Sequence, residues 1–172
     1  MIAIIAEKPS VGMDIARVVG ADTRNDGYCS GNGYMVTWAL GHLVSLAMPD
    51  TYGYTKTAAE ELPMLPDPFR LVSRQVRTDR GMVTDIAASK QLKVIESVFN
   101  RCDSIVVATD AGREGELIFR WIYDFLGCTK PFRRLWISSL TDEAIRKGLE
   151  ELKDGSEYDS LYTAADSRAK AD

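Results

Sequence analysis

Residues 105–119 read IVVATDAGREGELIF, the most informative stretch of the chain for its fold. An apolar run typical of a buried parallel strand ends at Asp110, and helical spacing begins shortly after it. An α/β domain usually places its chemistry at such a strand end. Two more carboxylates follow, Glu114 and Glu116, whereas Gly112 stands where a third closely spaced acid would complete a metal-binding pattern.

The N-terminus follows the same plan, because the apolar run from Ile2 to Ala6 leads into Glu7 and a helix that Ser10 can cap. A further strand, Leu135 to Ile137, precedes a helix that opens at Thr141. Apolar residues at helical spacing mark three helices, at Val11, Ile15, Val18 and Val19, at Leu92, Ile95, Val98 and Phe99, and at Ile118, Trp121, Ile122 and Phe125. Because strands and helices alternate, the sequence predicts an α/β fold with a layered parallel sheet.

A hairpin is predicted between the first two of these units. The segments Tyr28 to Ser30 and Tyr34 to Ala39 flank a GNG tripeptide, whose Asn32-Gly33 pair suits a tight turn. We expect this hairpin at the edge of the sheet. From Pro49 to Pro68 the chain is rich in proline, glycine and tyrosine, which predicts an irregular loop.

Length and composition favour one main domain, since 172 residues with 45% hydrophobic content can bury one core. A net charge of -4 argues against coating nucleic acid by bulk charge, so any DNA contact is expected to be local. The three cysteines show no CxxC spacing, which disfavours disulfides and structural zinc and favours a reducing cytoplasm. No signal-peptide pattern or membrane-length apolar run is present, and we expect no membrane partner.

The acids at the two strand ends are candidate metal ligands. Adjacent parallel strands would bring Glu7 and Asp110 together, and Glu114 lies one helical turn further on. Clustered carboxylates suit a hard ion such as magnesium, which often bridges to phosphate. The alternative is that these acids only cap helix N-termini, where negative charge is favoured anyway.

Cationic residues stand beside the same acids. Lys8 and Arg113 could hold a phosphate next to a metal, or could simply pair with a neighbouring carboxylate. His42, the only histidine, is either structural or functional. Two basic clusters could track a phosphate backbone or form solvated strand faces, namely Arg70, Arg74, Arg77 and Arg80, and Lys130, Arg133 and Arg134. Four aromatic residues could stack on unpaired bases or belong to the core, namely Trp38, Tyr52, Tyr54 and Trp136.

Four motifs, in order along the chain, carry a resemblance to a known family: AEKPS at 6–10, GHL at 41–43, TDAGREGE at 109–116 and LWISSLTDEAI at 135–145. Together they resemble the Toprim domain of a type IA DNA topoisomerase, most like the topoisomerase III group. This resemblance implies a parallel sheet between helices. It also implies a Toprim domain over residues 1–156, with residues 157–172 starting a following helical DNA-binding domain.

The resemblance assigns roles by position. Glu7 is similar to the glutamate that handles the proton of the DNA 3′ oxygen during cleavage and religation. Asp110 and Glu114 match the first and last acids of the family's DxDxE magnesium motif, which implies Mg²⁺ as cofactor with Glu7 as a further ligand. Lys8 matches a lysine that holds the scissile phosphate, and Arg113 matches the arginine within the motif.

The resemblance further implies contact with single-stranded DNA. Arg168 and Asp172 look like the start of the helix by which the next domain contacts DNA, and the loop of His42 lies near the cleft in this family. The nucleophile of the family is a tyrosine in a later domain, and no tyrosine here matches its context. The implied partners are DNA and the remaining domains of the same polypeptide, in the cytoplasm at the nucleoid.

The middle acid of DxDxE is Gly112 here, so we expect Asp110 and Glu114 to hold magnesium with Glu7 or Glu116 and water completing the shell. This predicts weaker magnesium binding, which Gly112→Asp would strengthen. One alternative is another Toprim enzyme, a primase or nuclease acting by itself. The GHL and LWISSLTDEAI segments favour the topoisomerase. Another alternative is a noncatalytic DNA-binding module, which the glycine supports and the cations beside intact acids oppose.

Overall fold

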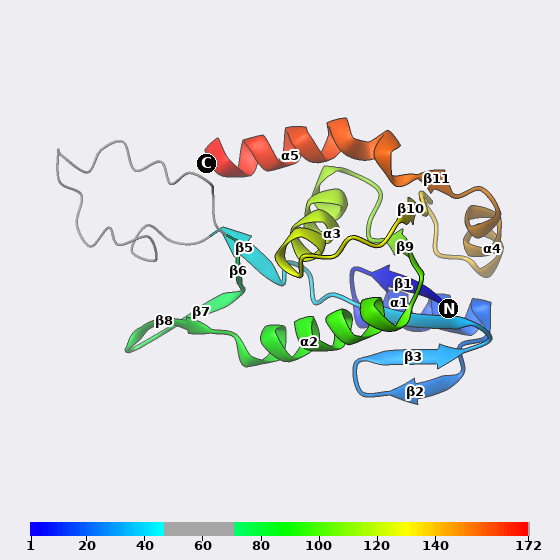
Figure 1. Ribbon diagram of the computed structural model, residues 1–172, viewed down its shortest axis with the longest axis horizontal. Coiled ribbons are helices and arrows are strands. Elements are labelled where there is room, and N and C mark those ends of the chain that lie inside the picture. Colours follow the sequence, from blue (N-terminus) through cyan, green and yellow to red (C-terminus); the bar gives the residue numbers. More distant parts are fainter. Residues whose placement is uncertain (47–70, 172) are drawn as a thin grey trace.

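The computed structural model describes residues 1–46 and 71–171. Seven strands form a central sheet in the order β11-β10-β9-β1-β4-β3-β2 (Figure 1). Four of them run parallel, namely β1 (Ile2–Ala6), β4 (Tyr34–Trp38), β9 (Ser104–Ala108) and β10 (Phe132–Arg134). Antiparallel pairings extend the sheet at both edges through β2 (Thr23–Asn25), β3 (Tyr28–Gly31) and β11 (Lys153–Asp154).

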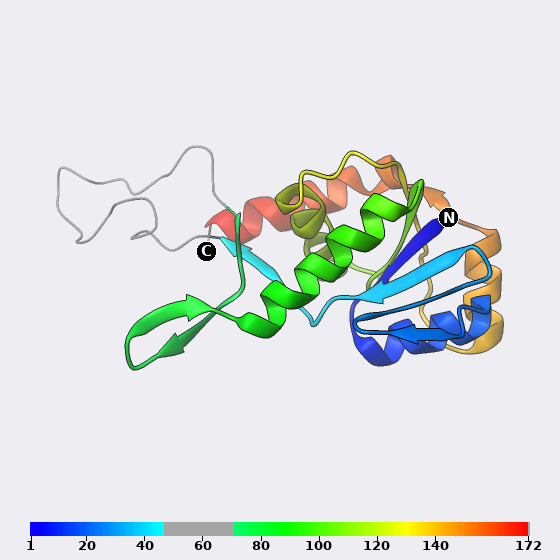
Figure 2. The same cartoon turned by 60° about the horizontal axis from the view of Figure 1, so that its bottom comes forward.

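Helices cover both faces of the sheet (Figures 1 and 2). The face of Ile4 and Ala6 packs on α1 (Pro9–Val19) and α4 (Asp142–Glu150). On the other face, Ala3 and Ile5 pack with α2 (Ile86–Arg101) and α3 (Arg113–Phe125), and α5 (Asp159–Ala171) lies against α3. The predicted α/β class, a mainly parallel sheet flanked by helices, is therefore confirmed.

Two small ribbons lie beside this body. The strands β5 (Val44–Leu46) and β6 (Leu71–Ser73) pair antiparallel. The hairpin of β7 (Gln75–Thr78) and β8 (Gly81–Thr84) projects away from the sheet in both views (Figures 1 and 2). A 3-10 turn over Gly155–Tyr158 leads from β11 into α5.

Several expectations about individual elements are confirmed and others are wrong. The strand Ile2–Ala6 has the predicted bounds, and Thr141 caps α4 by accepting a hydrogen bond from the Ala144 amide at 3.2 Å. Ser10 does not cap α1, because Lys8 occupies the cap position and Pro9 the first turn. The predicted strand Leu135 to Ile137 is wrong, since the strand is Phe132–Arg134 and ends just before it.

The Asn32-Gly33 turn is confirmed, with positive φ angles of 53° and 83° that suit a tight hairpin. Its position is not the predicted one: β4 lies inside the sheet beside β1, and β2, which the sequence did not reveal, forms the edge. The predicted loop Pro49 to Pro68 lies outside the described residues. Within the ranges described, no helix is long and apolar enough to cross a membrane.

Candidate functional site

Glu7 and Asp110 meet at the carboxyl ends of two neighbouring strands. In the parallel pair β1–β9, Ala6 lies opposite Ala108, so both chains leave the sheet at the same level. The Asp110 amide donates a hydrogen bond of 3.1 Å to Oε1 of Glu7. The sequence prediction that these two acids come together is confirmed.

Glu7 is a buried carboxyl group, with 9% of its surface exposed. Burial raises the pKa of Glu7 above its ordinary value, and the neighbouring Asp110 carboxylate raises it further. The hydrogen bond from the Asp110 amide and the charge of Lys8 lower this pKa but do not outweigh burial. A carboxyl group that retains its proton more readily is suited to general acid–base chemistry.

The turn from β9 into α3 is held by close backbone contacts. Thr109 donates its hydroxyl hydrogen to the Gly115 carbonyl at 2.8 Å. A Cβ atom at Gly115 would lie 1.9 Å from the carbonyl oxygen of Asp110, so only glycine fits there. Gly112 has a φ of +148° with open space around it, so its absent side chain reflects backbone conformation and not crowding.

Beneath this turn lies a buried ionic network that sequence reasoning missed. The side chains of Glu116 and Arg134 are 2% and 1% exposed, and Oε1 of Glu116 lies 3.1 Å from Nε of Arg134. Arg120 donates to the other Glu116 oxygen at 3.1 Å and pairs with Asp159 at 2.9 Å. Burial raises the pKa of Glu116, and the two guanidinium groups act against this. Both open interpretations of Arg134, a phosphate contact or a solvated face, are therefore wrong.

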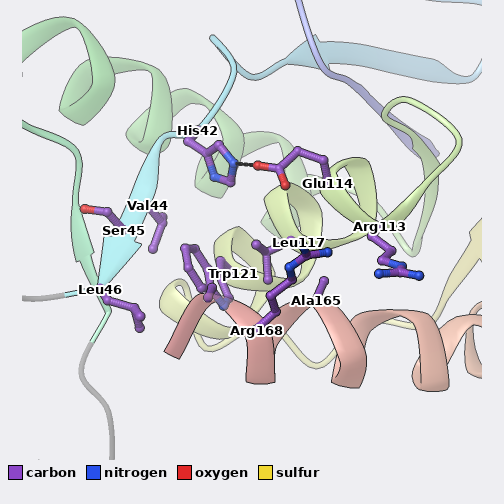
Figure 3. A pocket seen from close by; sticks show the side chains of 11 residues that line it. His42, Val44, Ser45, Leu46, Arg113, Glu114, Leu117, Trp121, Ala165 and Arg168 are labelled. Atoms are coloured by element: carbon purple, nitrogen blue, oxygen red, sulfur yellow. Dashed lines mark hydrogen bonds and ion pairs between the residues drawn. The ribbon is translucent and has the colours of Figure 1, made fainter. Parts of the chain in front are cut away.

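Glu114 turns away from the other acids and towards His42. Its Oε1 contacts Nε2 of His42, and Figure 3 shows the two side chains pointing at each other. The His42 ring also lies 6.0 Å from that of Trp121. The structure thus brings together a histidine and a carboxylate from segments 72 residues apart, a contact that no local pattern signals.

A cavity of about 540 Å³ lies beside this pair, between β5, α3 and α5. Arg113 and Arg168 line it together with His42 and Glu114, over an apolar floor that includes Trp121 (Figure 3). Four of the predicted site residues therefore share one cavity.

The remaining predicted site residues lie elsewhere. Lys8 is exposed at the start of α1, next to Glu7 in sequence. Asp172 lies outside the described residues, so its predicted contact with DNA stays a prediction.

Arg74 anchors the loop that carries His42. Its Nη1 donates to the carbonyl oxygens of Leu40 at 2.9 Å and His42 at 3.1 Å. Its Nε donates to Asp85, 2.9 Å away, which also caps α2. A structural arginine thus stands where sequence reasoning considered a phosphate contact.

The other residues of the basic and aromatic sets are mixed in role. Lys130 donates to the Cys102 carbonyl at 2.7 Å, whereas Arg77, Arg80 and Arg133 are exposed.

Among the aromatic residues, Trp38 is buried in the core, as one of the open interpretations held. Trp136 stacks on Tyr158 with ring centres 5.1 Å apart. The other members, Arg70, Tyr52 and Tyr54, lie outside the described residues.

The acids provide ligand chemistry that suits a hard metal ion. Glu7, Asp110 and Glu114 offer carboxylate oxygens, which magnesium prefers. In the part of the chain that the structure describes, no three His, Cys, Asp or Glu side chains form a group that could hold a metal. The convergence of all three carboxylates predicted from spacing is therefore not seen, because Glu114 is turned to His42. Its side chain is 71% exposed, which leaves it room to turn.

The chain is similar to a known domain family and to curated proteins that share one name. A family model described as the Toprim domain matches residues 2–140. The chain is 50% identical over 174 residues to "DNA topoisomerase 3" of Shouchella clausii, covering 99% of this chain and 22% of that protein. It is 46% identical to "DNA topoisomerase 3" of Bacillus subtilis, and the match covers 98% of this chain and 22% of that protein. The chain thus spans about a fifth of the length of these curated relatives.

A solved structure, full-length topoisomerase I from Thermotoga maritima, has a similar fold. Its TM-score is 0.54 at 18% sequence identity, over 88% of this chain and 21% of that one. At this identity the likeness shows the fold alone, and it agrees with the layered sheet described above.

Proposed function

The chain belongs to the Toprim domain family, and on that basis we propose that it supplies the acidic half of the active site of a type IA DNA topoisomerase. The curated relatives that match nearly the whole chain are named DNA topoisomerase 3. In this proposal the intact enzyme cleaves and religates single-stranded DNA through a 5′ phosphotyrosine. The tyrosine comes from other domains of the same polypeptide.

The observation that carries the proposal is the contact between Glu7 and Asp110 at the ends of β1 and β9. Glu7 passes a proton to the departing 3′ oxygen when the tyrosine attacks the phosphate, and takes it back when the 3′ hydroxyl reseals the strand. Its raised pKa supports this role, since a buried carboxyl group holds the proton more readily. Covalent storage of the phosphodiester removes the need for a nucleotide cofactor.

The cations and the metal have supporting roles. Toprim domains generally bind metal, and in this proposal Asp110 and Glu7 would hold Mg²⁺ together with Glu114, once the exposed Glu114 side chain turns from His42. The ion would supply positive charge that offsets the charge of the phosphate. Lys8 holds the scissile phosphate from its exposed position after β1.

The DNA strand contacts the cavity beside the acids. His42, Arg113 and Arg168 line it and supply two guanidinium groups and an imidazole for the strand. Asp172, at the end of the same C-terminal segment, is a further proposed DNA contact. This placement would put the strand next to Glu114.

A chimera tests the proposal directly. This chain replaces the matching fifth of Bacillus subtilis DNA topoisomerase 3, and the product is assayed for relaxation of supercoiled DNA and for a covalent 5′ adduct. The chimera should be active, and Glu7→Gln, which keeps the shape but not the titrating carboxyl, should slow it by about a hundredfold or more. The exposed control Glu96→Gln, on α2, should leave activity unchanged.

The outcomes separate the alternatives. The 172-residue chain alone should neither form an adduct nor nick DNA, and metal-dependent nicking by it would favour a Toprim nuclease. A folded chimera that binds DNA without relaxing it would favour a noncatalytic module. Full activity of Glu7→Gln would contradict the role given to Glu7.

A further inference from the structure

Arg134 ends the strand β10, yet its side chain is only 1% exposed. Its guanidinium group spans the space between β9 and α3. Nη1 donates to the Val107 carbonyl at 3.1 Å and to the Thr109 hydroxyl at 3.0 Å, and Nη2 donates to the Asp110 carbonyl at 2.6 Å. Nε pairs with Glu116 at 3.1 Å. A single side chain thus ties the strand end that carries Asp110 to the first turn of α3.

The turn held in this way has little room to adjust. The Thr109 hydroxyl accepts from Arg134 and donates to the Gly115 carbonyl. The Asp110 carbonyl oxygen accepts the hydrogen bond from Nη2 of Arg134. Gly115 packs against the same oxygen, and a Cβ at position 115 would lie 1.9 Å from it. Any shift of the guanidinium would therefore release the Asp110 peptide and the start of α3 together.

Stability alone does not account for this arrangement. Replacing a buried ion pair by apolar residues of similar volume is often neutral or stabilising, so the pair is not needed to fill the core. What apolar residues cannot do is bind three oxygen atoms in a fixed geometry, as a planar guanidinium does.

We propose that Arg134 is a positioning residue for the acidic site. It fixes the Asp110 peptide, which keeps the Asp110 amide on Glu7 and sets the backbone positions from which the Asp110 and Glu114 side chains extend. This inference rests on the proposed function of these acids as metal ligands. Groups that orient metal ligands typically change metal affinity by at least about tenfold when they are altered.

The test compares Arg134→Lys with Arg133→Lys in the 172-residue chain. Lysine retains the charge beside Glu116 but cannot bind the three oxygens at once, whereas Arg133 is exposed on the same strand and serves as the matched control. Mg²⁺ binding is measured by calorimetry. We expect Arg134→Lys to weaken it about tenfold and Arg133→Lys to leave it unchanged.

A second measurement needs no metal. Hydrogen exchange followed by NMR should show faster exchange of the Asp110 amide in Arg134→Lys, with unchanged exchange at Ile5 in the centre of β1. Equal acceleration at both amides would mean general destabilisation and would overturn the proposal. Unchanged Mg²⁺ affinity together with unchanged Asp110 exchange would also overturn it.

Three further variants separate the metal site from the role of Arg134. Asp110→Asn tests the metal site itself: if it binds Mg²⁺ as tightly as the unmodified chain, the metal assignment fails, while the Asp110 amide still reports on Arg134. If Arg134→Lys does not fold, Thr109→Val removes one acceptor of the guanidinium and Thr109→Ser retains it. Affinity and exchange in Thr109→Val equal to those in Thr109→Ser would then refute the positioning role.

Discussion

Removing one partner of the buried pair of Glu116 and Arg134 should cost several kilocalories per mole of stability, because the other charge is then left buried without its partner. Glu116→Gln keeps the shape of the side chain and removes the charge 3.1 Å from Nε of Arg134. Breaking a buried pair by removing one partner costs about 3–5 kcal/mol. Because Arg134 keeps three hydrogen bonds and Arg120 keeps Asp159, we expect the lower end, about 3 kcal/mol.

The size of this effect can be followed in two ways. For a chain of this length, 1 kcal/mol corresponds to about 2–4 °C in Tm, so Glu116→Gln should lower Tm by about 6–12 °C. Urea unfolding monitored by tryptophan fluorescence gives the free energy directly. Lys90→Gln, which removes an exposed ion pair with Asp26, is the control and should change stability far less.

A double-mutant cycle isolates the pair. Arg134→Met removes the other partner, and the double variant should be more stable than the sum of the two single effects by about 2 kcal/mol, since neither charge is then left alone. Strict additivity, or a loss below about 1 kcal/mol for Glu116→Gln, would refute the argument that these charges depend on each other.

Three further predictions concern the acidic site. Burial raises the pKa of Glu7, so the folded chain binds this proton more tightly than the unfolded chain, and stability falls as pH rises from the ordinary value of 4.5 through the raised pKa. Urea titrations should therefore show that Glu7→Gln stabilises the chain at pH 8 and not at pH 4. The gain at pH 8 should be about 1.4 kcal/mol for each tenfold increase in the proton affinity of Glu7 on folding. Equal effects at both pH values would contradict this. Gly115→Ala should lower Tm sharply because its Cβ meets the Asp110 carbonyl, whereas Gly112→Ala, which meets nothing, should cost only about 1–3 kcal/mol for its positive φ; similar losses would argue against the close approach. Gly112→Asp should bind Mg²⁺ more tightly at the same cost in stability, and calorimetry showing no gain in affinity would count against the metal arrangement.

Local patterns in the sequence were sufficient for the framework of the fold. Apolar runs indicated the buried strands β1 and β9, and helical spacing indicated the buried face of α2. The meeting of Glu7 and Asp110 followed from these, because parallel neighbours end at the same edge of a sheet. The strand at Leu135 to Ile137 was wrong because an apolar segment after a strand end can be buried without pairing: Leu135 is 2% exposed outside β10.

Contacts between distant segments could not be read in the same way. Arg133 and Arg134 are adjacent and chemically identical, and only the alternation of β10 between β9 and β11 sends one to solvent and the other to Glu116. No local sign was available for Glu116, because at helical spacing it lies opposite the stripe of Ile118, Trp121, Ile122 and Phe125 by which the sequence indicates this helix. Only the folded structure shows that Glu116 is buried and which cation it meets.

Patterns in the sequence thus predicted a layered sheet, the family and the two acids at the strand ends, since apolar periodicity and motif spacing are local properties. Tertiary structure alone decided that Glu114 faces His42 and that Arg134 holds the Asp110 turn from inside. The direction of a polar side chain depends on where its hydrogen-bonding partners lie after folding, and these partners are 72 and 24 residues away along the chain.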